Sequence, residues 1–154
     1  MNGSAEAFEG GCLCGVLRYR ALGPARFATL CHCASCRRAA GAPAVAWVSF
    51  AVAAFAFTSG EPVHFRSSPP VVRSFCGRCG TPLAYRHEGF PQLVDISTAS
   101  LDDPERCPPL DHSWVSERLR WWRPEPRWPE FPRSRLDGGQ GVEPGAEQAV
   151  RLAV

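Results

Sequence analysis

Lysine is absent from this 154-residue chain, so arginine supplies all 17 basic residues. Against 15 acidic residues the formal net charge is only +2. So small an excess does not indicate a nucleic-acid partner, because such partners are bound by strongly basic surfaces. The missing lysine, together with 14 glycines and 15 prolines, indicates codon bias more than chemistry.

Long apolar runs are also missing, and no stretch approaches the roughly 18 residues that a membrane span needs. The first eleven residues lack the basic segment followed by an apolar one that a signal peptide requires. We therefore expect a cytoplasmic protein without a membrane partner. In that reducing compartment the eight cysteines are expected to be metal ligands or catalytic thiols, not disulfides.

The length and the 45% hydrophobic content fit one compact core and leave no room for a second. We expect a single domain over residues 1–132. Large apolar residues become scarce after Pro132, and residues 133–154 are therefore predicted to form a disordered tail.

Short segments that are apolar or alternate between apolar and polar residues recur between turn signals, which predicts a mainly β fold of short antiparallel strands. The expected strands are 16–20, 27–30, 44–50, 55–58, 63–66, 71–75, 83–86 and 92–97. Residues 37–40 have helical propensity, but Gly41 and Pro43 limit them to one short turn. Residues 101–109 are rich in proline and acid, which predicts a surface loop in which Cys107 is a spare thiol.

Three thiols fall within the six residues 31–36, whose sequence is CHCASC. Zinc takes four tetrahedral ligands, and a catalytic zinc typically takes three from the protein and leaves the fourth position for water or substrate. Cys31, Cys33 and Cys36 therefore predict either an open site of this kind or one part of a closed cluster with other cysteines.

Two further pairs of thiols lie in glycine-flanked turns, Cys12 with Cys14 and Cys76 with Cys79. Glycine tolerates the positive φ that lets backbone N–H groups face the sulfurs of such a turn. Four ligands from two turns are typical of a closed structural zinc site, which leaves the thiols of residues 31–36 as a second, open set. Iron also fits the four-thiolate site, because both metals accept tetrahedral sulfur.

Two other cysteine chemistries are excluded by the surrounding residues. A c-type haem needs histidine directly after C-x-x-C, but Arg37 follows Cys36 and Gly80 follows Cys79. A thioredoxin-type dithiol needs a βαβ context, which the flanking strands and prolines do not provide.

Several motifs occur in a fixed order over about residues 10–123. They are GCLCG at 11–15, CHCASCR at 31–37, GA at 41–42, FCGRCGTPL at 75–83, LDDP at 101–104, His112, and WW at 121–122. This ordered set resembles the family of glutathione-dependent formaldehyde-activating enzymes, which also includes the centromere protein V type.

The resemblance implies a zinc-binding β-tent domain with two metal sites. It implies a structural zinc on Cys12, Cys14, Cys76 and Cys79 and a catalytic zinc on Cys31, Cys33 and Cys36. An open zinc can bind a substrate thiol as thiolate, the nucleophile that attacks an aldehyde. The product would be a hemithioacetal such as S-hydroxymethylglutathione, from glutathione and formaldehyde, and the reverse step cleaves a carbon–sulfur bond, as lyases do.

Other polar residues near the thiols have two or more interpretations each. Arg37 and Arg38 lie beside the triad. They pair with the carboxylates of a glutathione-like substrate, favour the thiolate electrostatically, or are solvated charges on a short helix. His32 could coordinate the metal, relay a proton or bond to the backbone. His112 either approaches the cleft or is a hydrogen-bonded structural histidine.

The alternative function is a non-catalytic zinc scaffold that binds a macromolecule. It is suggested by arginines and tryptophans that could pair with phosphates and stack on bases, namely Arg118, Arg120, Trp121, Trp122, Arg123, Arg127 and Trp128. Glu117, Glu125 and Glu130 dilute this patch. The sequence therefore favours a small-molecule thiol and an aldehyde as partners over nucleic acid.

Overall fold

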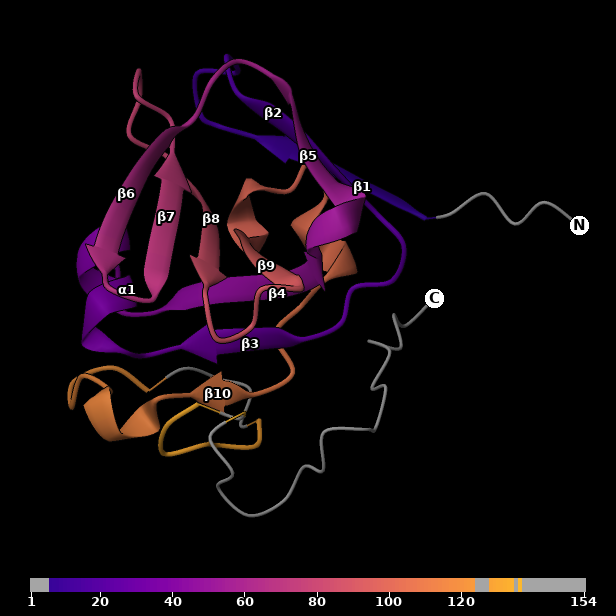
Figure 1. Cartoon of the computed structure of the whole chain (residues 1–154). Coiled ribbons are helices and arrows are strands. Elements are labelled where there is room, and N and C mark those ends of the chain that lie inside the picture. The colour runs from indigo at the N-terminus through magenta and orange to yellow at the C-terminus, as the bar shows by residue number, and fades with distance from the viewer. Residues whose placement is uncertain (1–5, 124–127, 135, 137–154) are drawn as a thin grey trace, which may run out of the picture.

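The computed structural model describes residues 6–123, 128–134 and 136, and this part of the chain is mainly β, as predicted. Its strands form a three-stranded sheet of order β1-β2-β5 and a seven-stranded sheet of order β10-β3-β4-β9-β8-β7-β6 (Figure 1). The strands are β1 (Ala7–Gly11), β2 (Arg18–Leu22), β3 (Ala28–Cys31), β4 (Val45–Ala51), β5 (Phe55–Ser59), β6 (Val63–Ser68), β7 (Val71–Phe75), β8 (Pro82–His87), β9 (Leu93–Ser97) and β10 (His112–Ser113).

Helical structure is sparse in the described residues. One α-helix, α1 (Ala34–Ala40), follows β3. The short 3₁₀ turns are η1 (Val52–Ala54), η2 (Thr98–Ser100), η3 (Pro104–Arg106) and η4 (Val115–Glu117). No helix of the described chain is long and apolar enough to cross a membrane.

Alternation along β4 gives the larger sheet two different faces. Val48 and Phe50 are fully buried and pack into a core shared with the smaller sheet, where the Phe8 and Phe50 ring centroids lie 5.0 Å apart. Trp47 and Ser49 point the other way, since successive side chains of a strand alternate between faces. That second face lines a cavity.

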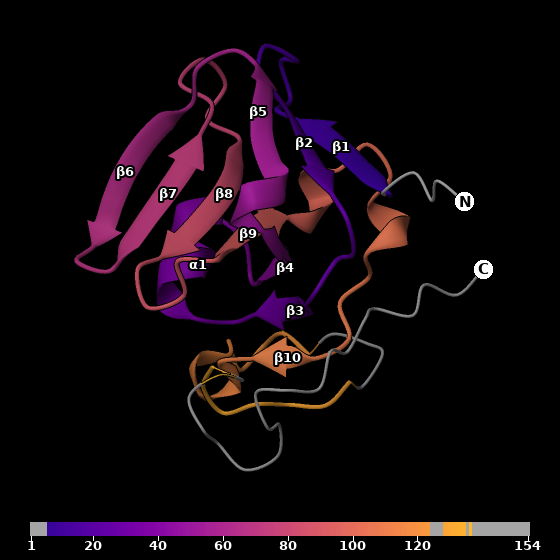
Figure 2. The same cartoon turned by 45° about the vertical axis from the view of Figure 1, so that its right-hand side comes forward.

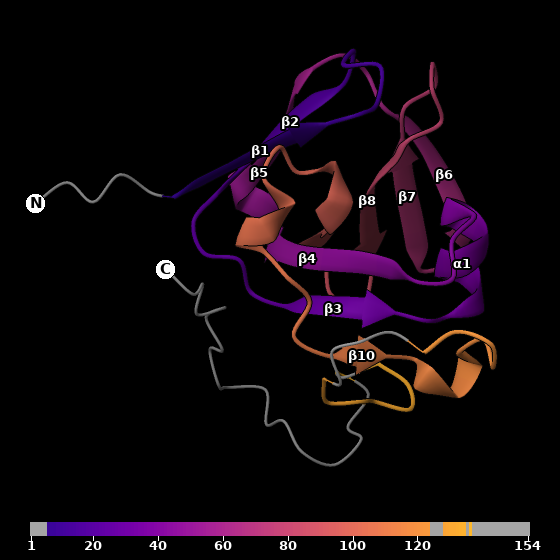
Figure 3. The same cartoon turned by 180° about the vertical axis from the view of Figure 1, so that it is seen from behind.

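The larger sheet is strongly twisted, and β6 to β8 run across the direction of β3 and β4 (Figures 1, 2 and 3). Twist accumulates over successive strands, and bulges increase it locally. The pairing shifts register between Arg66 and Ser68 in β6 and between Ser74 and Phe75 in β7. The twist brings the beginning of β7 and the end of β8 toward α1 (Figures 1 and 2).

Two strands were absent from the sequence prediction. In β1 the alternating buried residues are Phe8 and Gly10, and a glycine carries no apolar signal. A Cβ at Gly10 would collide with the Tyr19 hydroxyl and the Ser100 carbonyl, so the close approach of β2 requires glycine there. The other missed strand, β10, is too short for any pattern and pairs in parallel with β3.

The prediction of a single helical turn at 37–40 was wrong, because α1 already begins at Ala34. The Cys33 side chain caps this helix by accepting a hydrogen bond from Cys36 N at 3.3 Å. Cysteine is not among the usual N-cap residues, so no signal in the sequence marks the start of this helix. The helix ends at Gly41 in the left-handed conformation, as expected.

The segment 101–109 is not simply a surface loop, since Leu101 and Cys107 belong to the main core. Cys107 is fully buried, and this burial raises the pKa of its thiol to about 11. Cys107 lies outside both groups of clustered thiols among the described residues. It is therefore a core residue, not an exposed spare thiol.

We expect Cys107→Ala to lower the free energy of unfolding by about 1 kcal/mol, since it removes one buried sulfur and leaves a small cavity. The melting temperature should fall by a few degrees, and the zinc content should not change. Thermal unfolding and metal analysis of the purified variant check both parts. Loss of a zinc equivalent would show that Cys107 is a ligand.

Most of the predicted tail, 133–154, lies outside the described residues, and the domain boundary at residue 132 stays a prediction. The described residues 131–133, at the predicted boundary, pack along β10 and η4. Phe131 N donates to His112 O at 2.8 Å, and Trp114 N donates to Arg133 O at 3.1 Å.

Candidate metal centres and cavity

The four cysteines predicted to share a site meet at one end of the molecule. Cys12 and Cys14 follow β1, while Cys76 and Cys79 follow β7. Their four Sγ atoms all lie within 4.8 Å of one another. The cluster thus joins a turn of the smaller sheet to a turn of the larger one.

Hydrogen bonds to these sulfurs fit thiolate ligands. Leu17 N donates to Cys12 Sγ at 3.2 Å, and the Thr81 side chain lies 3.2 Å from Cys79 Sγ. The Thr81 hydroxyl and backbone lower the pKa of Cys79 to about 5. Gly80 has φ +78°, as the prediction for this turn required. The donor set suits a tetrahedral metal ion such as zinc.

The other three cysteines, Cys31, Cys33 and Cys36, form a second cluster whose Sγ atoms also lie within 4.8 Å of one another. Cys31 ends β3, Cys33 caps α1 and Cys36 lies in the first turn of that helix. The end of β3 and the start of α1 thus bring the three thiols together. Cys31 and Cys36 are buried, and Cys33 is half-buried.

Crowding makes these three thiols electrostatically unequal. Hydrogen bonds from Cys31 and then Cys33, with a smaller contribution from Arg73, lower the pKa of Cys36 to about 2. Hydrogen bonding with Cys33, and then with Cys36, raises the pKa of Cys31. Three adjacent thiolates repel one another unless a cation lies among them, and a divalent metal ion would supply that charge.

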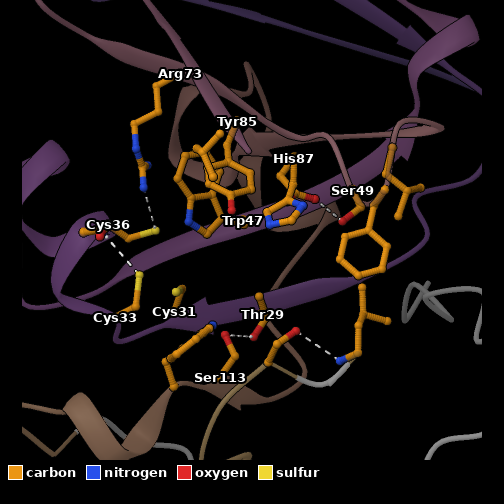
Figure 4. A pocket seen from close by; sticks show the side chains of 18 of the residues that line it. Thr29, Cys31, Cys33, Cys36, Trp47, Ser49, Arg73, Tyr85, His87 and Ser113 are labelled. Atoms are coloured by element: carbon orange, nitrogen blue, oxygen red, sulfur yellow. Dashed lines mark hydrogen bonds between the residues drawn. The ribbon is translucent and has the colours of Figure 1, made fainter. Parts of the chain in front are cut away.

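The three-thiol cluster opens on a cavity of about 410 Å³. In Figure 4 the cysteines lie at one end of this cavity, Ser49 and His87 lie at the other, and Trp47 and Tyr85 lie between them. The described lining residues include no member of the four-thiol cluster. The two clusters therefore differ in their access to a small molecule.

Arg73 is a cavity residue that sequence reasoning missed. One of its guanidinium nitrogens lies 3.6 Å from Cys36 Sγ, and its guanidinium carbon lies 5.0 Å from the centre of the Tyr85 ring. Within β7 nothing distinguishes it from an ordinary exposed strand residue. Only the pairing of Arg73 with Tyr85 across β7 and β8 reveals its position.

The arginines that the sequence singled out, Arg37 and Arg38, do not line the cavity. Arg37 donates to His32 O at 3.0 Å and to Glu117 O at 3.2 Å, and Arg38 is exposed. Arg37 thus fixes α1 against η4, and the interpretation in which the two arginines pair with substrate carboxylates stays a prediction.

Glu117 is a second missed residue, which the sequence analysis treated only as a charge diluting a basic patch. Its Oε2 accepts a hydrogen bond from Ala34 N at 2.6 Å, at the N-terminus of α1. A carboxylate is favourable there because the first N–H groups of a helix lack intrahelical partners. This hydrogen bond holds the start of α1, with Cys33 and Cys36, in place. Glu117 also lines the cavity.

The two histidines lie behind the three-thiol cluster. His32 is fully buried, since its side chain alternates with those of Cys31 and Cys33, and its Nε2 lies 3.0 Å from Nδ1 of His112. Burial, then the charges of Arg118 and His112, lower the pKa of His32 to about 4. His112 is therefore a buried, hydrogen-bonded histidine. His32 bonds to the His112 side chain, and it belongs neither to a thiol cluster nor to the described lining of the cavity.

Part of the patch of arginines and tryptophans is used in packing. The Trp122 ring lies 5.7 Å from His32, the Trp128 ring lies 5.3 Å from His112, and Arg118 pairs with Glu130. Trp121 is 73% exposed, and Arg127 lies outside the described residues. Arg120 and Arg123 are also exposed, so the members of the patch used in packing are Arg118, Trp122 and Trp128.

Comparison with known proteins gives one family and one fold. The family model described as "Glutathione-dependent formaldehyde-activating enzyme" matches residues 7–117, which is more than half of the chain. A crystal structure of a Rhodobacter sphaeroides protein is similar, with a TM-score of 0.50 and 18% identity over 61% of this chain and 87% of that chain. At that identity the likeness concerns the fold alone. A search of curated proteins returned no match.

Proposed function

Because this chain belongs to the family of glutathione-dependent formaldehyde-activating enzymes, we propose that it is a zinc-dependent enzyme that joins a thiol to an aldehyde. The proposed model reaction forms S-hydroxymethylglutathione from glutathione and formaldehyde. A carbon–sulfur bond forms, and the carbonyl oxygen gains a proton. The reverse reaction breaks that bond, so the enzyme is of the carbon–sulfur lyase type.

The observation that carries this proposal is that Cys31, Cys33 and Cys36 lie at the end of the 410 Å³ cavity. Three protein ligands and an accessible fourth position are typical of a catalytic zinc, whereas four ligands are typical of a structural one. We assign the structural role to the cluster of Cys12, Cys14, Cys76 and Cys79.

Zinc held by the three-thiol cluster would supply an open ligand position that favours the thiolate form of a substrate thiol. The protein adds a positive charge at the same end of the cavity, because the Arg73 guanidinium lies 3.6 Å from Cys36 Sγ. A substrate sulfur there is thus favoured as an anion.

Tyr85 provides a hydroxyl proton in the same cavity. Burial is the largest cause that raises the pKa of Tyr85, followed by the charge of Cys36, so the phenol stays protonated at neutral pH. It can therefore donate a hydrogen bond to the oxygen of a bound aldehyde. The Trp47 ring lies 5.9 Å from the Tyr85 ring and adds an apolar wall to the same cavity.

We expect the zinc-loaded protein to accelerate exchange between free and hydroxymethylated glutathione well above the uncatalysed rate. The exchange can be followed by NMR at fixed glutathione and formaldehyde, with protein depleted of metal by a chelator as the control. The control should show the uncatalysed rate. If the loaded protein also gives that rate, the glutathione–formaldehyde reaction is ruled out, and other thiol–aldehyde pairs become the candidates.

A further inference from the structure

The cavity extends along β3, away from the thiols. Cys31 and Thr29 line it, and Phe27 continues this series of lining residues beside β4, where Ser49 N donates to Phe27 O at 2.8 Å. A strand rises about 3.3 Å per residue, so the backbones at Cys31 and Phe27 are about 13 Å apart. A cavity of about 410 Å³ and this length can hold more than the atoms that react at its thiol end.

The end away from the thiols presents apolar side chains. The Phe90 ring lies 5.5 Å from the ring of His87, which Figure 4 shows at this end. Leu93 begins β9, and its N donates to Phe90 O at 3.0 Å. Both Phe90 and Leu93 line the cavity, are half-buried, and belong to neither of the two hydrophobic clusters found among the described residues. Their exposed apolar surface is therefore available to a ligand.

The polar side chains at this end already interact with other parts of the protein. The Ser49 hydroxyl donates to Asp95, which takes part in a further interaction. His87 Nδ1 accepts a hydrogen bond from Gly89 N at 3.0 Å. A polar group of a ligand would lose its hydration here for few new hydrogen bonds, whereas an apolar group gains from burial.

We propose that this end of the cavity binds an apolar group of about the size of a phenyl ring, and that the aldehyde carries this group. The apolar site does not depend on the function proposed above, but its assignment to the aldehyde rests on that function. Tyr85, which would donate to the aldehyde oxygen, lies between the two ends of the cavity in Figure 4. A substituent on the carbonyl carbon can therefore extend from there toward Phe90 and Leu93.

Neither substrate of the model reaction fills the apolar end. Formaldehyde has no substituent, and the remainder of glutathione carries carboxylates and an ammonium group, which are costly to bury among apolar side chains. An aldehyde with an apolar substituent suits both ends. The addition itself is unchanged, because the sulfur bonds to the carbonyl carbon and the thiol proton passes to the oxygen.

Titration of the zinc-loaded protein, followed by fluorine NMR, tests the apolar site without a thiol or an aldehyde. The probes are 4-fluorobenzyl alcohol and 2-fluoroethanol, which share a fluorine and a hydroxyl but differ in the ring. The wild-type protein should bind the alcohol with the ring at least about tenfold more tightly, because only this probe buries a large apolar surface. Phe90→Ala should bind it at least about fivefold more weakly than wild type, because a ring contact is lost.

Phe65→Ala is the matched control, because it removes the same ring from an exposed position on β6 that is not part of the described lining. It should bind both alcohols as wild type does. Equal binding of the two alcohols by the wild-type protein, or unchanged binding by Phe90→Ala, overturns the apolar site. The wild-type comparison decides the matter even if Phe90→Ala does not fold.

Exchange assays with the ring on either partner test the assignment to the aldehyde. Phenylacetaldehyde with 2-mercaptoethanol carries the ring on the aldehyde, and formaldehyde with 2-phenylethanethiol carries it on the thiol. Relative to the uncatalysed rates, the wild-type protein should accelerate the first pair at least about tenfold more than the second, and Phe90→Ala should lose this advantage. Equal acceleration, or a larger one for the second pair, overturns the assignment to the aldehyde.

The two kinds of measurement separate this proposal from the proposed function. If the alcohols bind as expected but no pair is accelerated, glutathione with formaldehyde included, the apolar site stands, and the proposed function falls together with the assignment to the aldehyde. If the wild-type protein does not prefer the alcohol with the ring, the apolar site is wrong, whatever the exchange assays show.

Discussion

Replacing Cys76 by Ser is expected to leave the protein unfolded or aggregated. Cys76 is 1% exposed, belongs to the main core, and lies in the cluster that joins the turn after β1 to the turn after β7. Structural zinc contributes about 10–16 kcal/mol to the folding of small zinc domains. A domain of this size has a total stability of only about 5–15 kcal/mol. Weakening the metal site should therefore remove most of the free energy of unfolding, and Cys12→Ser should have the same effect.

Circular dichroism, gel filtration and metal analysis of the purified variant check this expectation. Cys107→Ala is the control, because Cys107 is a thiol buried in the same core but outside both clusters. Metal analysis of the wild-type protein also decides between zinc and iron at the four-thiol site. A Cys76→Ser protein that is soluble, free of zinc at this site and as stable as wild type would contradict the structural assignment.

The grouping of Cys12 and Cys14 with Cys76 and Cys79 was predictable, because each pair of cysteines lies within one short turn of the sequence. Each pair lies in a turn whose glycines are visible in the sequence, and a four-ligand site needs only that two such pairs be counted. Apart from β10, the strands of the larger sheet were predictable to within about two residues for the same reason, since their apolar pattern is local. The missed β1 and β10 lack that signal, one because it contains glycine at a buried position and the other because it has only two residues.

The cavity was not predictable from local patterns. Arg73, Tyr85 and Asp95 are separated by ten or more residues in the sequence and meet only through the registers of β7, β8 and β9. Glu117 reaches the N-terminus of α1 from 83 residues away. Proximity in sequence pointed to Arg37, which contacts His32 and Glu117 and does not line the cavity. The clusters of thiols could thus be found by spacing, while the residues that line the cavity depend on how the sheet is paired.

Replacing Cys33 by Ser should leave the protein folded with about one zinc in place of two, and without activity. The change removes a soft thiolate from the three-thiol cluster but leaves Cys12 and the rest of the four-thiol cluster unchanged. Cys33 also caps α1, and serine is a favoured N-cap residue, so the helix start is preserved. Losing one ligand weakens the metal at this cluster alone if the two sites are independent. Folding and catalysis should then separate.

The melting temperature should stay within a few degrees of wild type, and exchange between free and hydroxymethylated glutathione should fall to the uncatalysed rate. Cys33→Ala separates the two roles of this residue, because alanine removes both the thiolate and the cap and should cost a further 1 kcal/mol or so of stability. Equal exchange rates in wild type and Cys33→Ser would exclude the glutathione–formaldehyde reaction while leaving other substrates open. A Cys33→Ser protein that does not fold at all would mean that the three-thiol cluster is structural, because a site that only serves catalysis can lose its metal without losing the fold.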